Sequence, residues 1–402
     1  MSKDPQRKKS HGPVTVNESR AIRTVMELLR VPGVSCEERA IARKIVAILR
    51  RAGVPKGAMV FDRAHQRSPY GGNCGNLIVK LPGTIAAPRR MLLAHMDTVP
   101  ICRHAKPVRR AKFITSARKG TGVGADNRSG VGALVVALTE ILGQGLSHPP
   151  LTFLFTVQEE IGLVGARFVS KRLLGSPHLA FNYDGGPPEC VEIGATGGHY
   201  LSIDVTGVAA HAGGQPERGV SAAMIAAVAM TDLRRHGWFG LVNKHGVRGT
   251  SNIGTVCGGE ATNVVMDRLH VSGECRSFSV SLRNRIADAY RKAFERAAQN
   301  LVSSEGKCGS VKFVCTKKYE AFKLPKKSAS VNEVIRVLHR LDMKPELEYS
   351  NGGLDANWLA EHGIQAVTVG AGSLGAHTAD EKLMLDQFLA GCRLAVGLAT
   401  GL

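Results

Sequence analysis

Apolar residues recur along the chain with two different spacings, which predict alternating strands and helices. Short apolar runs at 76–81, 91–95, 151–157 and 179–184 have the length of buried strands. Between them, GVGALVVALTEIL (130–142) has the length of a buried helix. Strands that alternate with helices are typical of a mainly parallel α/β sheet.

Two amphipathic helices are predicted before the first of these strands. TVNESRAIRTVMELLRV repeats its apolar residues at helical spacing. Ser35 and Glu38 then have the spacing of a capping box, so a second helix should begin near them and end before Gly53.

The pattern changes near residue 194 and returns to the α/β type near 317. An alternating strand (GGHYLSIDVTG), a helix (SAAMIAAVAMTDLRR), two further strand candidates (SNIGTVCGG and DRLHVSGECRSFSV) and a long amphipathic helix (RNRIADAYRKAFERAAQNLV) indicate an α+β insert. A helix at 331–341, the strand IQAVTVG and a C-terminal helix follow. We therefore expect a disordered basic tail (1–13), one discontinuous α/β domain (14–193 and 317–402) and an inserted α+β domain (194–316).

Composition limits the class of protein. The first residues, MSKDPQRKKSHGP, contain no apolar segment, and no later stretch approaches the ~20 apolar residues of a membrane span. The 9 cysteines are scattered and never spaced as CxxC, which argues against a disulfide framework and a thiolate metal site. We therefore expect a cytoplasmic protein with reduced thiols and no membrane partner.

The formal net charge of +20 is unusual, with Lys and Arg concentrated in the first residues and in CRHAKPVRRAKFITSARKG (102–120). Such a charge suits a polyanionic partner. However, aromatic residues make up only 5% of the chain and no nucleic-acid-binding motif is present. We expect a solvated basic surface without a specific nucleic-acid partner, and we expect 102–120 to be a loop.

Imidazole and carboxylate side chains follow the predicted strands or lie in the glycine-rich loop GVGADNRSG: His95, Asp97, Asp126, Glu159, Glu160, Asp184 and His377. The carboxyl ends of parallel strands are where α/β proteins build their sites. Such ligands, without thiolates, suit Zn²⁺, Co²⁺ or Mn²⁺, and a bridging carboxylate would allow two ions ~3.5–4 Å apart. The adjacent carboxylates of Glu159 and Glu160 would repel each other if buried, a cost that a nearby divalent cation would offset.

Each of these residues alone has an ordinary structural explanation. A histidine at a strand end is commonly structural, and a carboxylate in a glycine-rich loop commonly forms a turn or caps a helix. The joint pattern is what favours a metal site.

The motifs HMDTVP, GADNRSG, FTVQEEIGLVGA, YDGG and GAHTADE occur in this order. Together they resemble the M20 family of metallopeptidases, in particular its tripeptidase-T-like members, within the superfamily of peptidase T, carboxypeptidase G2 and aminoacylase. The insert segments VTGVAAHAGGQPERGVSAA, SNIGTVCGGEATNVV and ECRSF resemble that family's lid. The M42 aminopeptidases share the QEEIGL-type motif but lack the AHAG motif, so the chain resembles them less.

This resemblance implies a zinc-peptidase-like α/β catalytic domain with two metal ions and an inserted lid and dimerisation domain. It implies that His95 and Asp184 bind one metal and that Glu160 and His377 bind the other. Asp126 would bridge both metals. The ions would be divalent, with zinc the first choice and cobalt or manganese as alternatives.

Other roles follow from the same resemblance. Asp97 would orient the His95 imidazole, a role that metal-bound histidines generally require. Glu159 would be the general base that removes a proton from the attacking water. The peptide bond between Asp126 and Asn127 would be cis.

In the insert, the resemblance implies that His211 polarises the scissile carbonyl and stabilises the oxyanion. Asn263 and Arg276 would hold the substrate backbone or carboxylate. The matching segment SNGGLDANWLAEHGI adds Asn351 and Gly352 to the substrate-binding residues. Without the resemblance, the ordinary structural explanations are favoured: His211 would cap a turn, Asn263 would serve a turn, and Arg276 would be a surface charge.

Two positions depart from the family pattern. Asn127 stands where relatives commonly carry a second Asp, which is harmless if Asp126 is the bridging ligand. Phe278 stands where many relatives carry a polar or basic residue, which leaves the substrate side chain open.

The sequence therefore predicts a metal-dependent hydrolase of short peptides, aminopeptidase- or tripeptidase-like, in which a metal-activated water attacks the amide with Glu159 as base. An N-acyl or N-carbamoyl amino acid amidohydrolase would use the same site, and a basic binding protein with a vestigial site is the alternative from another class. We expect a homodimer formed through the lid, with His211 reaching the partner's site. A monomer that closes its lid on its own site is the alternative.

Overall fold

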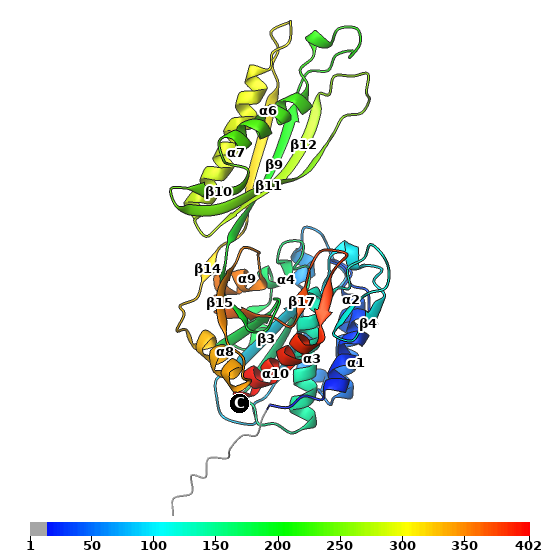
Figure 1. Cartoon of the computed structure of the whole chain (residues 1–402), viewed down its shortest axis with the longest axis vertical. Helices are drawn as coiled ribbons and strands as arrows, with labels where there is room; N and C mark the ends of the chain where they lie inside the picture. The colour runs from blue at the N-terminus through cyan, green and yellow to red at the C-terminus, as the bar shows by residue number, and fades with distance from the viewer. Residues whose placement is uncertain (1–13) are drawn as a thin grey trace, which may run out of the picture. The chain divides into compact units, whose positions relative to one another are not determined.

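The computed structural model describes residues 14–402, which form two compact units (Figure 1). Unit 1 comprises the described residues from 14 to 194 together with Lys323–Tyr349 and Leu354–Leu402. Unit 2 comprises Ala195–Phe322 and Ser350–Gly353. The tail predicted to be disordered, 1–13, lies outside the described residues.

Within residues 14–402, unit 1 is built on a nine-stranded sheet. Its spatial order is β1 (Met59–Phe61), β2 (Leu77–Leu81), β6 (Leu151–Thr156), β3 (Arg90–His95), β7 (Leu179–Tyr183), β16 (Ala366–Val369), β8 (Cys190–Ala195) and β14 (Phe322–Lys323), with β15 (Glu346–Ser350) paired to β8. The neighbours β6, β3, β7 and β16 run parallel, so their carboxyl ends meet at one edge. The predicted mainly parallel α/β core with a separate insert is confirmed.

Helices cover this sheet: α1 (Glu18–Leu29), α2 (Arg39–Arg51), α3 (Ala125–Gly143), α4 (Val164–Arg167), α5 (Lys171–Leu174), α8 (Ala329–Arg340), α9 (Asp355–Glu361) and α10 (Leu385–Thr400). Almost every residue of α3 is buried, because α3 packs against β3 on one side and against α1 and α10 on others. A helix that is apolar all round is expected in such a place. This packing fixes the start of α3 beside the carboxyl end of β3.

The basic segment 102–120 is not the loop that we expected. It contains β4 (Pro107–Arg109) and β5 (Phe113–Ser116), which form a four-stranded sheet with β17 (Ser373–Leu374) and β18 (Lys382–Met384). Ile114 is buried and pairs with Leu383. The prediction was wrong because the strands are short, and the partner that buries Ile114 is remote in sequence.

Unit 2 is an antiparallel sheet with two helices packed on it. The strands, in spatial order, are β10 (Gly240–Lys244), β11 (Val247–Gly258), β12 (Arg268–Ser277), β9 (Gly197–Thr206) and β13 (Ser310–Tyr319). The helices α6 (Ala222–Arg235) and α7 (Val280–Asn300) bury a core that includes Ile203, Ile225 and Phe294. The predicted α+β insert therefore has its own core.

Unit 2 extends past residue 316, where the sequence pattern places its end, because β13 continues to Tyr319. The apolar alternation of β13 fades into Lys317 and Lys318, which hides the strand's end from a pattern search. No helix in the described part of the chain is long and apolar enough to cross a membrane.

Candidate metal centre

The predicted ligands of unit 1 converge at the carboxyl edge of the parallel strands. His95 ends β3, Glu159 and Glu160 follow β6, Asp184 follows β7, Asp126 lies in the first turn of α3, and His377 lies between β17 and β18. Parallel strands bring their carboxyl ends together, which explains how residues far apart in sequence meet here.

The two oxygens of Asp126 face two different imidazoles. His95 Nε2 lies 3.1 Å from Asp126 Oδ1 and 3.3 Å from Asp184 Oδ1. His377 Nε2 lies 3.4 Å from Asp126 Oδ2 and 2.9 Å from Glu160 Oε2. Asp126 therefore stands between a His95–Asp184 pair and a His377–Glu160 pair, as a bridging carboxylate would.

The donor atoms fit a divalent cation. One ligand atom from each of His95, Asp126 and Glu160 lies within 4.8 Å of the other two. Glu160 Oε1 and Asp184 Oδ2 are buried, and neither has a hydrogen-bond partner among residues 14–402. Buried oxygens without a partner are costly, and a cation among them would remove that cost. The set of carboxylate oxygens and imidazole nitrogens suits Zn²⁺, Co²⁺ or Mn²⁺.

The electrostatics of the cluster agree with this fit. Burial, together with the charge of Asp126, raises the pKa of Glu160 to about 7. Hydrogen bonds to Asp126 and Glu160 raise the pKa of His377 to about 10. Burial alone would lower the pKa of His95, but Asp184 and Glu159 raise it well above its ordinary value. The carboxylates are thus crowded enough to attract positive charge strongly.

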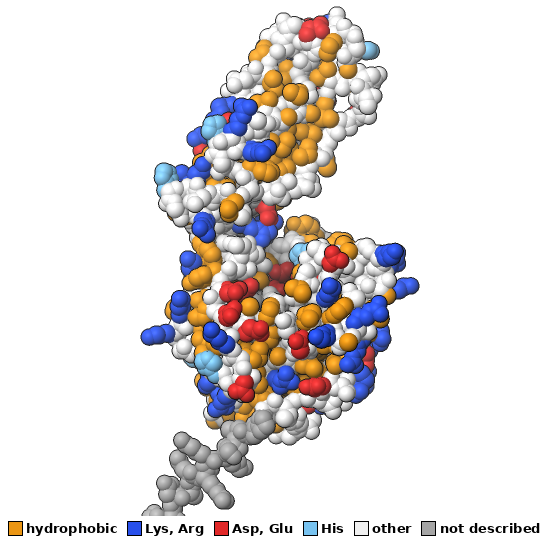
Figure 2. Space-filling model, viewed as in Figure 1, with side chains coloured by type: hydrophobic (Ala, Val, Ile, Leu, Met, Phe, Trp, Pro, Cys, Tyr) orange, Lys and Arg blue, Asp and Glu red, His pale blue; other side chains and the backbone are white. Residues whose placement is uncertain are grey.

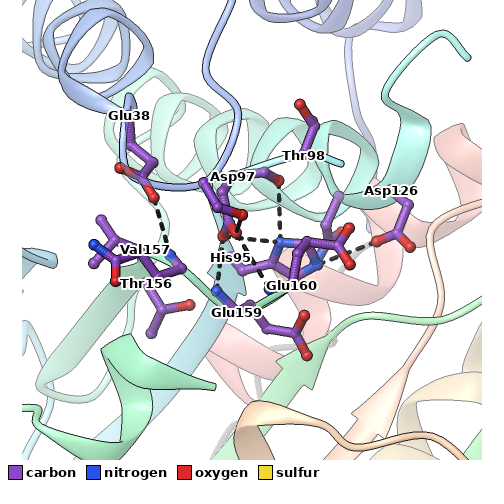
Figure 3. Close-up of polar contacts among 12 residues, drawn as sticks. Glu38, His95, Asp97, Thr98, Asp126, Thr156, Val157, Glu159 and Glu160 are labelled. Carbon is purple, nitrogen blue, oxygen red and sulfur yellow. Dashed lines mark hydrogen bonds and ion pairs between the residues drawn. The ribbon is translucent and has the colours of Figure 1, made fainter. Parts of the chain in front are cut away.

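Asp97 orders the residues around it (Figure 3). Its carboxylate accepts hydrogen bonds from the Ser35 hydroxyl at 2.6 Å and from the backbone N–H groups of Glu159 at 3.0 Å and Glu160 at 3.2 Å. His95 Nδ1 lies 3.2 Å from the Asp97 carbonyl oxygen and 3.5 Å from its Oδ1. Burial alone would raise the pKa of Asp97, but bonds from His95 and Ser35 hold it below its ordinary value. Asp97 therefore positions both His95 and the turn after β6.

Glu159 is differently placed from its neighbour Glu160. Glu159 is 8% exposed, and within residues 14–402 it forms no ion pair with His95 or His377. Burial, and then the charges of Asp184 and Glu160, raise its pKa well above the ordinary value of a carboxyl. A carboxylate with a raised pKa takes up a proton readily, which is the property that a general base near neutral pH needs.

Glu381 is a site residue that the sequence reasoning missed. It is buried, and its carboxylate accepts hydrogen bonds from the backbone N–H groups of Gly124 at 2.6 Å and Asp126 at 2.8 Å. It thereby holds the loop that carries Asp126. The signal was the motif GAHTADE, whose last residue is Glu381, although only its histidine was assigned a role.

The peptide bond between Asp126 and Asn127 is cis, as predicted. The Asn127 side chain donates to the Tyr183 carbonyl oxygen at 2.5 Å and accepts from the Gly130 N–H at 3.0 Å. A Cβ atom at Gly130 would lie 2.4 Å from Asn127 Oδ1, so only glycine fits there. Asn127 thus has a structural role, and its amide supplies a donor that an ionised Asp would lack.

The segments that carry two of the predicted residues of the insert, His211 and Asn263, meet within unit 2. His211 is exposed, and its Nδ1 accepts hydrogen bonds from the backbone N–H groups of Gly213 at 3.1 Å and Gly214 at 2.9 Å. The next residue, Ala212, donates its N–H to the Asn263 carbonyl oxygen at 2.9 Å. The segments that carry His211 and Asn263 therefore lie side by side.

A second pair meets at the return of the chain into unit 2. Arg276 Nη1 donates to the Asn351 carbonyl oxygen at 3.4 Å, and Arg276 Nε donates to Glu274 at 2.8 Å. The Gly352 N–H donates to Ser350 Oγ at 3.1 Å. The structure thus brings Arg276 together with the segment of Asn351 and Gly352.

Comparison with known proteins gives relatives of nearly the same length. The uncharacterized protein YqjE of Bacillus subtilis (strain 168) is 28% identical over 385 residues, covering 95% of this chain and 98% of that protein. The crystal structure of a tripeptidase from Staphylococcus aureus Mu50 has 27% identity and a TM-score of 0.84, covering 96% of this chain and 98% of the other. That of aminopeptidase PepT from Bacillus cereus ATCC 10987 has 28% identity and a TM-score of 0.79, with the same coverage.

The family comparison covers the whole candidate site. Residues 91–400 match the model of peptidase family M20/M25/M40, and this span includes every ligand candidate from His95 to His377. The resemblance inferred from the motifs is therefore confirmed. This chain belongs to peptidase family M20/M25/M40 and is a hydrolase of that family.

Proposed function

We propose that this protein is a two-metal hydrolase that removes residues from short peptides with a free α-amino group. The observation that carries the proposal is Asp126, whose two carboxylate oxygens face His95 and His377. The tripeptidase and the aminopeptidase to which the chain is similar over nearly its whole length support the substrate class.

The proposed metal ligands divide into two sets that share one residue. His95 and Asp184 would hold one divalent ion, Glu160 and His377 would hold the other, and Asp126 would contact both. When bound, such ions polarise a carbonyl group and lower the pKa of water. Zinc is our first choice, because nitrogen and oxygen donors bind it well, and cobalt or manganese would accept the same donors.

The chain's own residues would perform the proton transfers. Glu159 would accept a proton from the attacking water, and its raised pKa suits it to pass that proton to the leaving amine. Asp97 would keep His95 and the Glu159 backbone in place through the bonds described above.

His211 would donate a hydrogen bond to the scissile carbonyl oxygen. His211 Nδ1 accepts hydrogen bonds from two backbone N–H groups, so the neutral imidazole carries its hydrogen on Nε2. An Nε2–H donor on an exposed ring can reach a substrate oxygen where negative charge develops. The same two bonds would also suit a histidine that only stabilises a turn.

Arg276, Asn263, Asn351 and Gly352 would bind the substrate. Arg276 offers a guanidinium to a carboxylate, although Glu274 already pairs with its Nε. An amidohydrolase acting on N-acyl or N-carbamoyl amino acids would use the same arginine, so the α-amino group is what distinguishes the two substrate classes.

We also propose that unit 2 forms the contact between two copies in a homodimer. On α6, Met224 is 54% exposed and Val228 is 42% exposed, and residues four apart share a helix face. On β11, Val256 is 48% exposed, and the strand's second half has no neighbour on its outer side among the described residues. Figure 2 shows hydrophobic side chains gathered over unit 2. A second copy would cover this surface and the open strand edge.

The substrate class can be tested directly. We expect the zinc-, cobalt- or manganese-loaded protein to hydrolyse di- and tripeptides with a free amino terminus. Acetylating that amino terminus should abolish hydrolysis. A screen of matched free and N-acylated substrates measures this. Preference for the N-acyl or N-carbamoyl amino acids would establish the amidohydrolase instead.

The adjacent glutamates should behave differently. Glu159→Gln should keep its metal content and lose roughly 10²–10⁴-fold in turnover, the usual contribution of a general base. Glu160→Gln should instead lose metal, because its carboxylate is a proposed ligand. Elemental analysis and steady-state kinetics on both variants test the assignment, and the reverse pattern would show that base and ligand are exchanged.

Glu381 should affect metal binding without contacting the metal. Glu381→Gln removes the charge that orders the Asp126 loop, and we expect metal affinity to fall by roughly 10–100-fold, as for other residues that orient ligands. Competition titration with a metal-binding dye measures this. The matched control is Asp380→Asn, an exposed neighbour, which should bind metal like the wild type. Equal losses in the two variants would remove the proposed role of Glu381.

If His211 serves the partner's site, inactive variants should complement each other. Mixing His211→Ala with Glu159→Ala should restore up to about a quarter of wild-type activity, because half of randomly exchanged dimers are mixed and one site in each is complete. Each variant alone is the control. If labelled subunits exchange and the mixture stays inactive, His211 acts within its own chain or has no part in catalysis.

A further inference from the structure

A basic cavity of about 260 Å³ lies in unit 1, and none of the proposed metal ligands lines it. It is formed by the end of α1 and the turn after it, the segment 102–106, Arg118 and the start of α3. Six of its lining side chains are basic or imidazole: Arg30, Arg103, His104, Lys106, Arg118 and Arg128. No acidic side chain among the described residues lines it. The function proposed above assigns no role to this cavity.

Arg128 forms the inner wall and is only 2% exposed. Its Nη2 reaches the carbonyl oxygens of Val31 and Gly33 at 3.4 Å each, and Nη1 has no hydrogen-bond partner within residues 14–402. No carboxylate of that part of the chain forms an ion pair with it. A buried guanidinium that uses so few of its donors is costly. An anion in the cavity would lower that cost.

The rim of the cavity carries several cationic side chains, of which one is neutralised by a neighbouring carboxylate and three are not. Arg103 is paired with Glu37, at 2.6 and 2.9 Å. Arg30, Lys106 and Arg118 are exposed, and their side chains form no ion pair with any described residue. Several cations around one cavity favour an anion with more than one charge, and guanidinium groups match the oxygens of phosphate in pairs.

The size of the cavity limits the ligand. Pockets for drug-sized molecules have volumes of ~300–1,000 Å³, so a cavity of about 260 Å³ suits a small ion rather than a nucleotide or a nucleic acid. Figure 2 shows Lys and Arg side chains gathered on the side of unit 1 where Figure 1 labels β4 and α2. The basic residues of 102–120 thus supply part of the lining of a cavity that can admit a small anion.

We propose that this cavity binds a phosphate-type oxyanion, either free inorganic phosphate or the phosphate end of a small monoester. Arg128 would contact it from the inner wall, and Lys106 and Arg118 from the rim. Thr98 and Gly124 also line the cavity, and they lie next to Asp97 and close to Asp126 in the chain. The bound anion would therefore brace the two segments that carry the metal-site carboxylates. The proposal does not depend on the substrate of the enzyme.

Calorimetric titration of the full-length, metal-loaded protein with inorganic phosphate tests the proposal, with glycerol phosphate as the monoester. We expect one saturable site per chain. The double variant Lys106→Gln/Arg118→Gln should weaken binding at least about tenfold, because it removes two charge-assisted contacts. These side chains are exposed, so the variant should fold normally and unfold at the wild-type temperature without phosphate.

The matched control is Arg110→Gln/Lys119→Gln, which removes the same charge from the same segment but outside the cavity. Its affinity should stay within about threefold of wild type, because every side chain that lines the cavity is kept. Tighter binding of the monoester than of phosphate would identify the monoester as the source, and the reverse would identify the free ion.

Three results would overturn the proposal. Titration without saturation would show that no site exists. Equal losses in the two double variants would show general attraction to a basic surface. Binding that both variants retain and a chelator abolishes would place the phosphate at the metal centre instead.

Discussion

The carboxylate of Asp126 stands between the imidazoles of His95 and His377, and much of unit 1 serves to keep it there. The buried helix α3 places the start of its first turn beside the end of β3. Glu381 then fixes the loop by accepting hydrogen bonds from two of its backbone N–H groups. The next residue, Asn127, donates a hydrogen bond from its side chain to the Tyr183 carbonyl oxygen. These restraints come from three distant parts of the chain, which is why the position of one carboxylate constrains so much of the fold.

This arrangement has a cost in stability when no cation is bound. The pKa of Glu160 rises from 4.5 to about 7 on folding, chiefly because the side chain is buried. Between these pH values the folded chain holds a proton that the unfolded chain releases, so stability falls as pH rises through that window. A bound cation would reverse the penalty, because it favours the ionised carboxylate. Metal binding and folding of unit 1 should therefore be coupled, as in other sites whose ligands must be deprotonated.

The sequence predicted the strands and helices that are continuous, strongly apolar runs. It missed the features that depend on contacts with residues far along the chain. β3, β6 and β7 and the apolar part of α3 were found because each is a continuous apolar run of the right length. The capping box predicted from Ser35 and Glu38 does not form. Ser35 donates to Asp97, and Glu38 accepts the backbone N–H groups of Cys36 and Gln158. Local spacing cannot reveal a bond to a residue far along the chain, and the same limit hid Glu381 and the strands of the basic segment.

Unit 2 shows the same division between local and remote determinants. The orientation of His211 follows from its own turn, since Gly213 and Gly214 supply the N–H groups that fix Nδ1 as an acceptor. Arg276 depends instead on Ser350–Gly353, a short return of the chain whose flanking residues belong to unit 1. Thr196 anchors that return, because its N–H donates to the Ser350 carbonyl oxygen at 3.1 Å and its hydroxyl to that of Asn351 at 3.0 Å. The position of the proposed substrate-binding arginine therefore depends on residues of unit 2 that lie far apart in the sequence.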